Sequence, residues 1–134
     1  MSASTPGSDR PALAPPPERP PNCSLCGAVG TRLVTQASNR NGNAGRPYYK
    51  CLACRKFLVF DDRRGNDPAN PPCACGVSSK AQLSGRLNRR APRAKHFVCR
   101  LGRCNFYAES WNHDGSRDTV RDDLVEAMAA LSII

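Results

Sequence analysis

The sequence predicts a small, mostly β fold made of two tandem units, and three observations lead to that prediction. Eight cysteines fall into four close pairs along the chain. The arrangement of these pairs repeats with a period of about fifty residues, as in a duplicated unit. The chain of 134 residues is also poor in the large apolar side chains that two compact cores would need. Units of this size usually depend on bound metal or on disulfides for stability, so the cysteines are expected to stabilise both.

The spacing of the cysteines predicts two structural zinc sites. In a zinc ribbon, each close pair of cysteines lies in a tight turn, and two such pairs share one metal ion. A glycine directly follows the first pair of each unit, where backbone amides must approach the sulfurs closely. We therefore expect two Zn²⁺ ions, one held by Cys23, Cys26, Cys51 and Cys54 and the other by Cys73, Cys75, Cys99 and Cys104.

Two other arrangements are compatible with the same cysteines. Eight cysteines in a small chain can form the disulfide framework of a secreted protein. The duplicated close pairs and the lack of a secretion signal favour zinc, and thus a reducing compartment. We expect an intracellular, nuclear protein. A cross-braced fold, in which the first and third pairs share a metal, also remains open, although the duplicated spacing favours two independent sites.

The first half of the chain is expected to contain a tail and one ribbon. Residues 1–22 are dominated by Pro, Ala and Ser, so they cannot bury enough apolar surface to fold and are expected to be a disordered tail. Residues 23–67 form the first ribbon. Its strands are expected at 31–36, 47–51 and 56–60, separated by a loop rich in Asn and Gly.

The second half repeats this plan more loosely. A connection at 61–72, rich in Pro, Gly and Asn, leads into a divergent ribbon at 68–116. Its strands are expected at 77–83, 95–99 and 105–108. The predicted fold is therefore small, metal-stabilised and mostly β, with two tandem zinc ribbons.

A C-terminal amphipathic α-helix is expected at 117–134. Thr119, followed by acidic residues in the first turn, is typical of a helix start. Apolar residues recur at helical spacing. This face is expected either to cap the core of the second ribbon or to dock a partner protein or a second copy, and it consists of Val120, Leu124, Ala127, Met128 and Leu131.

Residues 23–62 resemble the GRF zinc finger family. That family shows a Cys pair with Gly, then Gly-Arg-x-aromatic-aromatic-x-Cys, then Cys followed by aromatic residues and Asp. The resemblance implies a crescent-shaped zinc ribbon of the kind attached to DNA repair enzymes and topoisomerases, where it binds single-stranded DNA. The tandem arrangement is similar to that of small GRF-like zinc-ribbon proteins of fungi. The residues at the positions of the pattern are Cys23, Cys26, Gly27, Gly45, Arg46, Tyr48, Tyr49, Cys51, Cys54, Phe57, Phe60 and Asp61.

The second unit matches the GRF pattern in part. Arg93 and Ala94 stand where Gly-Arg would be, and His96 replaces the first aromatic residue. We therefore expect the second ribbon to be structural or auxiliary. Because side chains alternate along a strand, Phe97 is expected in the core with Cys99, whereas His96 is expected at the surface, as is His113.

Charge and aromatic residues indicate a nucleic-acid partner. Residues 23–107 contain 16 basic and three acidic residues, whereas the C-terminal end is acidic. Single-stranded nucleic acid binds through cations along the phosphates and aromatic rings that stack on bases. Alternation places Tyr49 in the core with Cys51 and leaves Tyr48 outward for stacking, although Tyr48 could instead simply cover the ribbon. The expected phosphate contacts are Arg40, Arg46, Lys50 and Lys56, and a further basic loop contains Arg86, Arg89, Arg90, Arg93 and Lys95.

The predicted function is that of a zinc-binding protein with a module for single-stranded nucleic acid, DNA being the expected kind. The alternative is an adaptor whose ribbons and C-terminal helix recruit a protein partner. No enzyme activity is expected, because an all-thiolate zinc site leaves no coordination position for water. No segment is long and apolar enough to indicate a membrane span.

Overall fold

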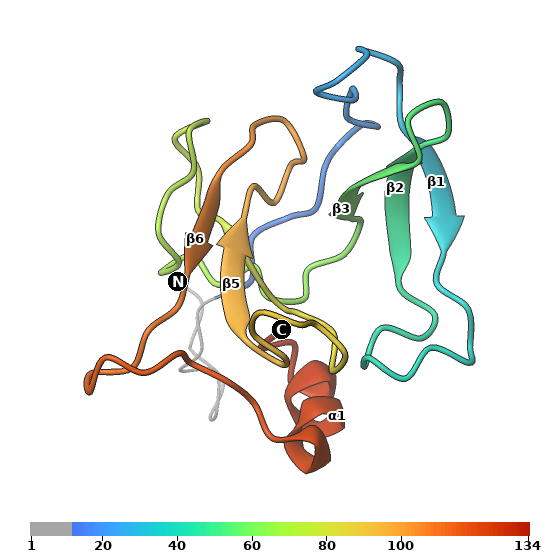
Figure 1. The fold of residues 1–134 in the computed structure, drawn as a ribbon. Helices are drawn as coiled ribbons and strands as arrows, with labels where there is room; N and C mark the ends of the chain where they lie inside the picture. The colour runs from blue at the N-terminus through green and yellow to red at the C-terminus, as the bar shows by residue number, and fades with distance from the viewer. Residues whose placement is uncertain (1–11) are drawn as a thin grey trace, which may run out of the picture.

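The computed structural model describes residues 12–134, and it contains two three-stranded antiparallel sheets followed by one helix (Figure 1). The first sheet has the order β1-β2-β3, with strands at Thr31–Val34, Pro47–Cys51 and Lys56–Phe60. The second sheet has the order β4-β5-β6, with strands at Lys80–Leu83, Lys95–Val98 and Tyr107–Glu109. The two-ribbon fold expected from the sequence is confirmed.

Each ribbon is a meander that brings its four cysteines to one end. In the first ribbon, β2 is central, and its pairing with β3 contains a register shift between Tyr49 and Lys50. Tyr49 and Val59 are buried with Cys23 and Cys51 and form the thin core of this unit. In the second ribbon, the buried apolar residues are smaller, Ala81 and Ala94 among them. Neither ribbon has a large apolar core, which fits units stabilised by metal.

The two ribbons stand side by side and are in direct contact (Figure 1). A Cβ atom at Gly102, in the last cysteine turn of the second ribbon, would lie 2.9 Å from the Val59 Cγ1 atom of the first. The backbone N–H of Ala81 donates to the carbonyl oxygen of Gly65 at 2.8 Å, which joins β4 to the connection. Asn66 in this connection is fully buried. The connection therefore fixes the two units to each other.

Residues 12–22 differ from the expected disordered tail, and the expectation for residues 1–11 lies outside the described residues. The backbone of Ala14 exchanges hydrogen bonds with Asn66, accepting from its Nδ2 at 3.0 Å. Arg63 and Arg100 donate to the carbonyl oxygens of Leu13 and Pro15. A proline-rich segment has few amide donors of its own, and here side chains of the folded units donate to its carbonyl groups.

The C-terminal helix is shorter than expected and buries a different face. Helix α1 runs from Asp122 to Ala130, and Thr119 instead forms an isolated bridge with Ala94 of the second ribbon. Val125, which the sequence pattern did not indicate, is buried with Val120 and Ile134, and Leu83 and Met128 pack against this cluster. Leu124 and Leu131 of the expected face are exposed. The described part of the chain has no helix with the length and apolar character needed to cross a membrane.

Candidate metal centres and nucleic-acid interface

The eight cysteines form two compact clusters, one at the end of each ribbon. The sulfurs of Cys23, Cys26, Cys51 and Cys54 all lie within 4.8 Å of one another, and so do those of Cys73, Cys75, Cys99 and Cys104. All eight thiols are free, and each cluster combines buried with more exposed members. The first two pairs share one cluster and the last two share the other, so the fold is not cross-braced.

Backbone amides surround the sulfurs in the tight turns. The N–H groups of Leu25 and Cys54 donate to the Sγ atoms of Cys23 and Cys51, each at 3.4 Å. The N–H of Cys75 donates to the Sγ of Cys73 at the same distance. Amides that point at sulfur stabilise thiolates, which are the form that binds metal.

The pKa values of the thiols show why each cluster requires a cation. Hydrogen bonds from the backbone of Cys26 and Leu25 lower the pKa of Cys23 to about 7. A hydrogen bond with Cys26 and the nearby sulfurs raise the pKa of Cys54 to about 12. Four thiolates this close repel one another, so all four can ionise together only around a positive ion. Four cysteine ligands in a closed cluster are the donor set of structural zinc, and the two clusters fit two zinc ions.

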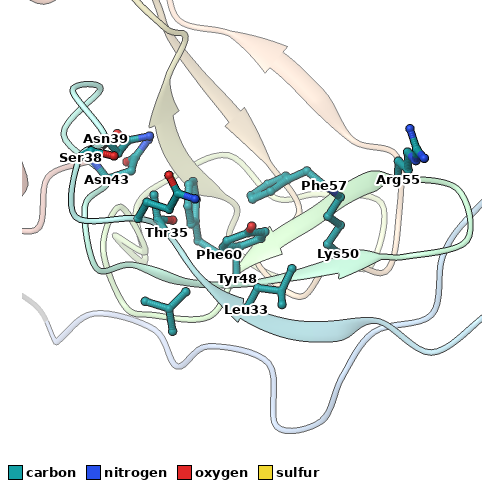
Figure 2. Close-up of a pocket in the computed structure, with 12 residues that line it drawn as sticks. Leu33, Thr35, Ser38, Asn39, Asn43, Tyr48, Lys50, Arg55, Phe57 and Phe60 are labelled. Carbon is teal, nitrogen blue, oxygen red and sulfur yellow. Dashed lines mark hydrogen bonds between the residues drawn. The ribbon is translucent and has the colours of Figure 1, made fainter.

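A groove of about 590 Å³ crosses the outer face of the first ribbon (Figure 2). Three aromatic rings line it. The rings of Tyr48 and Phe57 are stacked, with centroids 5.7 Å apart, and Phe60 meets Phe57 edge to face at 4.8 Å. The register places Phe60 opposite Tyr48 and Phe57 opposite Lys50, so two neighbouring strands build this surface.

Polar side chains flank the aromatic rings. Figure 2 shows Lys50 and Arg55 near Phe57 at one end of the groove and Asn39 and Asn43 at the other. No carboxylate is among the residues that line the groove in the described part of the chain. The groove therefore offers flat aromatic surface, cations and amide groups together.

The structure brings only two of the predicted nucleic-acid residues into this groove. Tyr48 and Lys50 line it, and Tyr49 is buried as expected. Lys56 lines a hollow between the two ribbons, and Arg40 lines another hollow beside the acidic helix α1. These four positions are close in sequence, but their side chains lie on different surfaces, because side chains alternate along a strand and because Arg40 lies in the long loop before β2.

The prediction that Arg46 contacts phosphate is not supported by its position, because this side chain is only 4% exposed. Its Nε and Nη2 atoms donate to both carboxylate oxygens of Asp62, at 2.7 and 3.0 Å. The guanidinium also lies 3.7 Å from the centroid of the Phe60 ring. Arg46 thus holds an aromatic ring of the groove in place from below.

Sequence reasoning missed Arg55, Phe57 and Phe60 as site residues. Both phenylalanines follow the last cysteine pair of the first unit, and the GRF pattern includes aromatic residues there. The antiparallel pairing of β2 with β3 places these two residues beside Tyr48, and this pairing could have been used to predict them. Arg55 lines the edge of the groove from the cysteine turn before β3, where its backbone has a φ of 57° and side-chain alternation along a strand does not apply.

The second ribbon departs from its prediction at β5. His96 is buried rather than at the surface; it stacks on Tyr107 at 5.0 Å and its Nε2 lies 3.0 Å from the Nε2 of Gln82. Burial lowers the pKa of His96, so the ring is neutral near pH 7. Phe97, expected in the core, is only half-buried, whereas His113 is exposed as expected.

Arg93 also differs from its prediction, because its side chain is not exposed with those of the basic loop. It is buried and donates from Nε to Asp122 Oδ1 at 2.8 Å, and its guanidinium reaches the carbonyl oxygens of Arg40 and Asn41. Its φ is 54°, and Gly45 at the matching position of the first ribbon has a φ of 76°. The second unit therefore keeps the backbone turn without the glycine and uses the arginine to join the first ribbon to α1.

The fold and the two four-cysteine clusters define a tandem zinc-ribbon protein that binds zinc. Residues 20–64, which contain the first ribbon, match the model of the GRF-like zinc ribbon domain family. Among solved structures, the chain matches the crystal structure of the tandem zinc finger GRF domains of human NEIL3. The identity is 25%, the match covers 66% of this chain and 94% of that one, and the TM-score is 0.25. A comparison with curated protein sequences gave no match.

Proposed function

We propose that the first ribbon binds single-stranded nucleic acid in the aromatic groove, with DNA as the kind that the GRF resemblance implies. The observation that carries this proposal is the group of three aromatic rings beside Lys50 and Arg55 in a groove without carboxylates. Bases that are free of a duplex can stack on Tyr48 and Phe57, while the two cations neutralise adjacent phosphates.

The chemistry of the groove favours weak sequence preference and strong dependence on salt. A base stacked on an aromatic ring contributes about 1–3 kcal/mol, and every base has a face that can stack. Asn39 and Asn43 at one end can donate from their Nδ2 groups to a base edge, because their Oδ1 atoms already accept hydrogen bonds within the protein. Affinity should fall as salt rises, because phosphate contacts release counterions.

Fluorescence anisotropy with labelled single-stranded and duplex oligonucleotides tests the proposal. We expect tighter binding of the single strand, and Tyr48→Ala should weaken it by about 1–3 kcal/mol because one stacking ring is lost. Trp111→Ala is the matched control, since Trp111 is an exposed aromatic residue outside the groove. Zinc content should stay unchanged in both variants. Equal affinity for single strand and duplex, or a Tyr48→Ala protein that binds like the wild type, would contradict the proposal.

A second candidate function is a protein contact through α1. The observation behind it is that Leu124 of α1 and Leu131, the C-cap of this helix, remain 45% and 52% exposed, whereas the other face of the helix is buried. A second copy of the chain is the partner that can be tested directly. Sedimentation velocity over a range of concentrations should then show association by the wild type and less by Leu124→Asp. A wild-type protein that stays monomeric throughout would reject self-association.

A further inference from the structure

We infer that the hollow between the two ribbons continues the aromatic groove and holds a further nucleotide of the same single strand. This inference rests on the proposed function of the first ribbon. The hollow measures about 390 Å³ and is lined from both units, by Lys56, Phe57 and Leu58 of β3 and by residues such as Gln82 and Tyr107 of the second sheet.

Phe57 links the two sites. It lines the aromatic groove together with Tyr48, and it also lines the hollow between the ribbons. One face of the ring stacks on Tyr48, and the side chain is 39% exposed. A strand whose base stacks in the groove can therefore pass over Phe57 and enter the hollow without leaving the protein.

The second ribbon supplies an aromatic surface at the far side of the hollow. Tyr107 is 58% exposed, and its inner face stacks on His96 with an interplanar angle of 26°. Gln82 lies within hydrogen-bonding distance of His96 and holds that ring in place. Tyr48 and Phe57 stack in the first ribbon at the same angle. Tyr107 thus has a fixed ring beneath it and its outer face open to a base.

The hollow offers one cation to a phosphate backbone, on the side of the first ribbon. Lys56 lines it there, whereas Cys99 and Cys104 of the second metal cluster line it from the second ribbon, and no carboxylate is among its lining residues in the described part of the chain. This gives a place to Lys56, one of the cations predicted from the sequence. With Lys50 and Arg55 in the groove, cations of the first ribbon line both the groove and the hollow.

The hollow is preformed because the ribbons are locked together. Lys80 of the second sheet donates from Nζ to Asp62 Oδ1 at 2.8 Å, and the same carboxylate accepts from Arg46 of the first unit. Gly102, which lines the hollow, lies against Val59 and Pro21. A strand that binds across both units therefore does not have to order them first, and this lowers the entropic cost of binding.

Oligonucleotides of two lengths separate this inference from the proposed function. An oligothymidine of about four nucleotides fits one groove, whereas one of about ten can reach both. Tyr107→Ala should weaken binding of the longer strand about 5- to 100-fold and leave the shorter unchanged, whereas Tyr48→Ala should weaken both. Tyr107→Phe, which keeps the ring, and Trp111→Ala should bind both lengths like the wild type. Lys56→Gln should reduce the salt dependence for the longer strand alone.

Each result has one interpretation, provided that the variants retain the zinc content of the wild type. If Tyr107→Ala and Lys56→Gln bind both lengths like the wild type while Tyr48→Ala is weakened, the inference is overturned and the proposed function stands. Equal loss at both lengths in Tyr107→Ala would also overturn it, because the effect would not come from a separate nucleotide. If the wild type binds neither length, the proposed function fails and the inference fails with it.

Discussion

Asp62 joins the two ribbons through its carboxylate. Burial would raise its pKa, but hydrogen bonds from Arg46 and the charge of Lys80 lower the pKa overall. Burial lowers the pKa of Lys80 to about 8, although Asp62 opposes this shift. The ammonium also donates to Asn66 Oδ1 and to the carbonyl oxygen of Asp62. A lysine buried this deeply depends on its anionic partner to stay charged.

Removal of the carboxylate should therefore cost more than removal of the lysine. Asp62→Ala leaves Lys80 and Arg46 buried without their counter-ion, and we expect a loss of about 3–5 kcal/mol in the free energy of unfolding. Lys80→Met removes a buried charge while Asp62 keeps Arg46, so its cost should be much smaller. Urea unfolding with zinc present measures both. A neutral effect of Asp62→Ala, or a larger effect of Lys80→Met, would show that this ion pair does not hold the ribbons together.

At the scale of elements, the local sequence pattern predicted where the strands lie better than which of their side chains are buried. Strands β2 and β3 have the expected bounds, because Pro47, the alternating side chains and the cysteine turns define them locally. Whether a side chain is buried depends on residues far along the chain. His96 is covered by Gln82 and Tyr107. The buried face of α1 is the one that packs near Leu83 and Ile134, and the helical spacing of apolar residues within the helix does not reveal these contacts.

The connection between the ribbons leaves no room for a side chain at Gly65. Gly65 has a φ of 76°, and a Cβ atom there would lie 2.0 Å from the carbonyl oxygen of Ala81. Gly65→Ala should lower the free energy of unfolding by more than about 2 kcal/mol. The alanine would have to adopt a strained φ, and the backbone at Ala81 would also have to move away from the new Cβ atom. Gly115→Ala is the control, with a φ of 86° and nothing within 4 Å of the added atom, and should cost about 1–2 kcal/mol. If urea unfolding showed equal losses of stability for Gly65→Ala and Gly115→Ala, the backbone of the connection would be able to move at no cost, and the prediction would be wrong.

At the scale of the whole molecule, charge is divided between surfaces. The net charge is +9, yet acidic side chains gather on and around α1. Asp122, Asp123 and Glu126 line one hollow beside the helix, whereas the aromatic groove and the hollow between the ribbons have no lining carboxylate among the described residues. This division should direct a polyanion to the groove and away from the helix.

A nuclear magnetic resonance titration of the ¹⁵N-labelled, zinc-loaded protein with a single-stranded oligonucleotide tests this account most directly. The account predicts that the largest amide shift changes occur in β2 and β3, around Tyr48, Phe57 and Phe60, with little change in α1. Changes confined to α1, or none in β2 and β3 at saturating oligonucleotide, would contradict it.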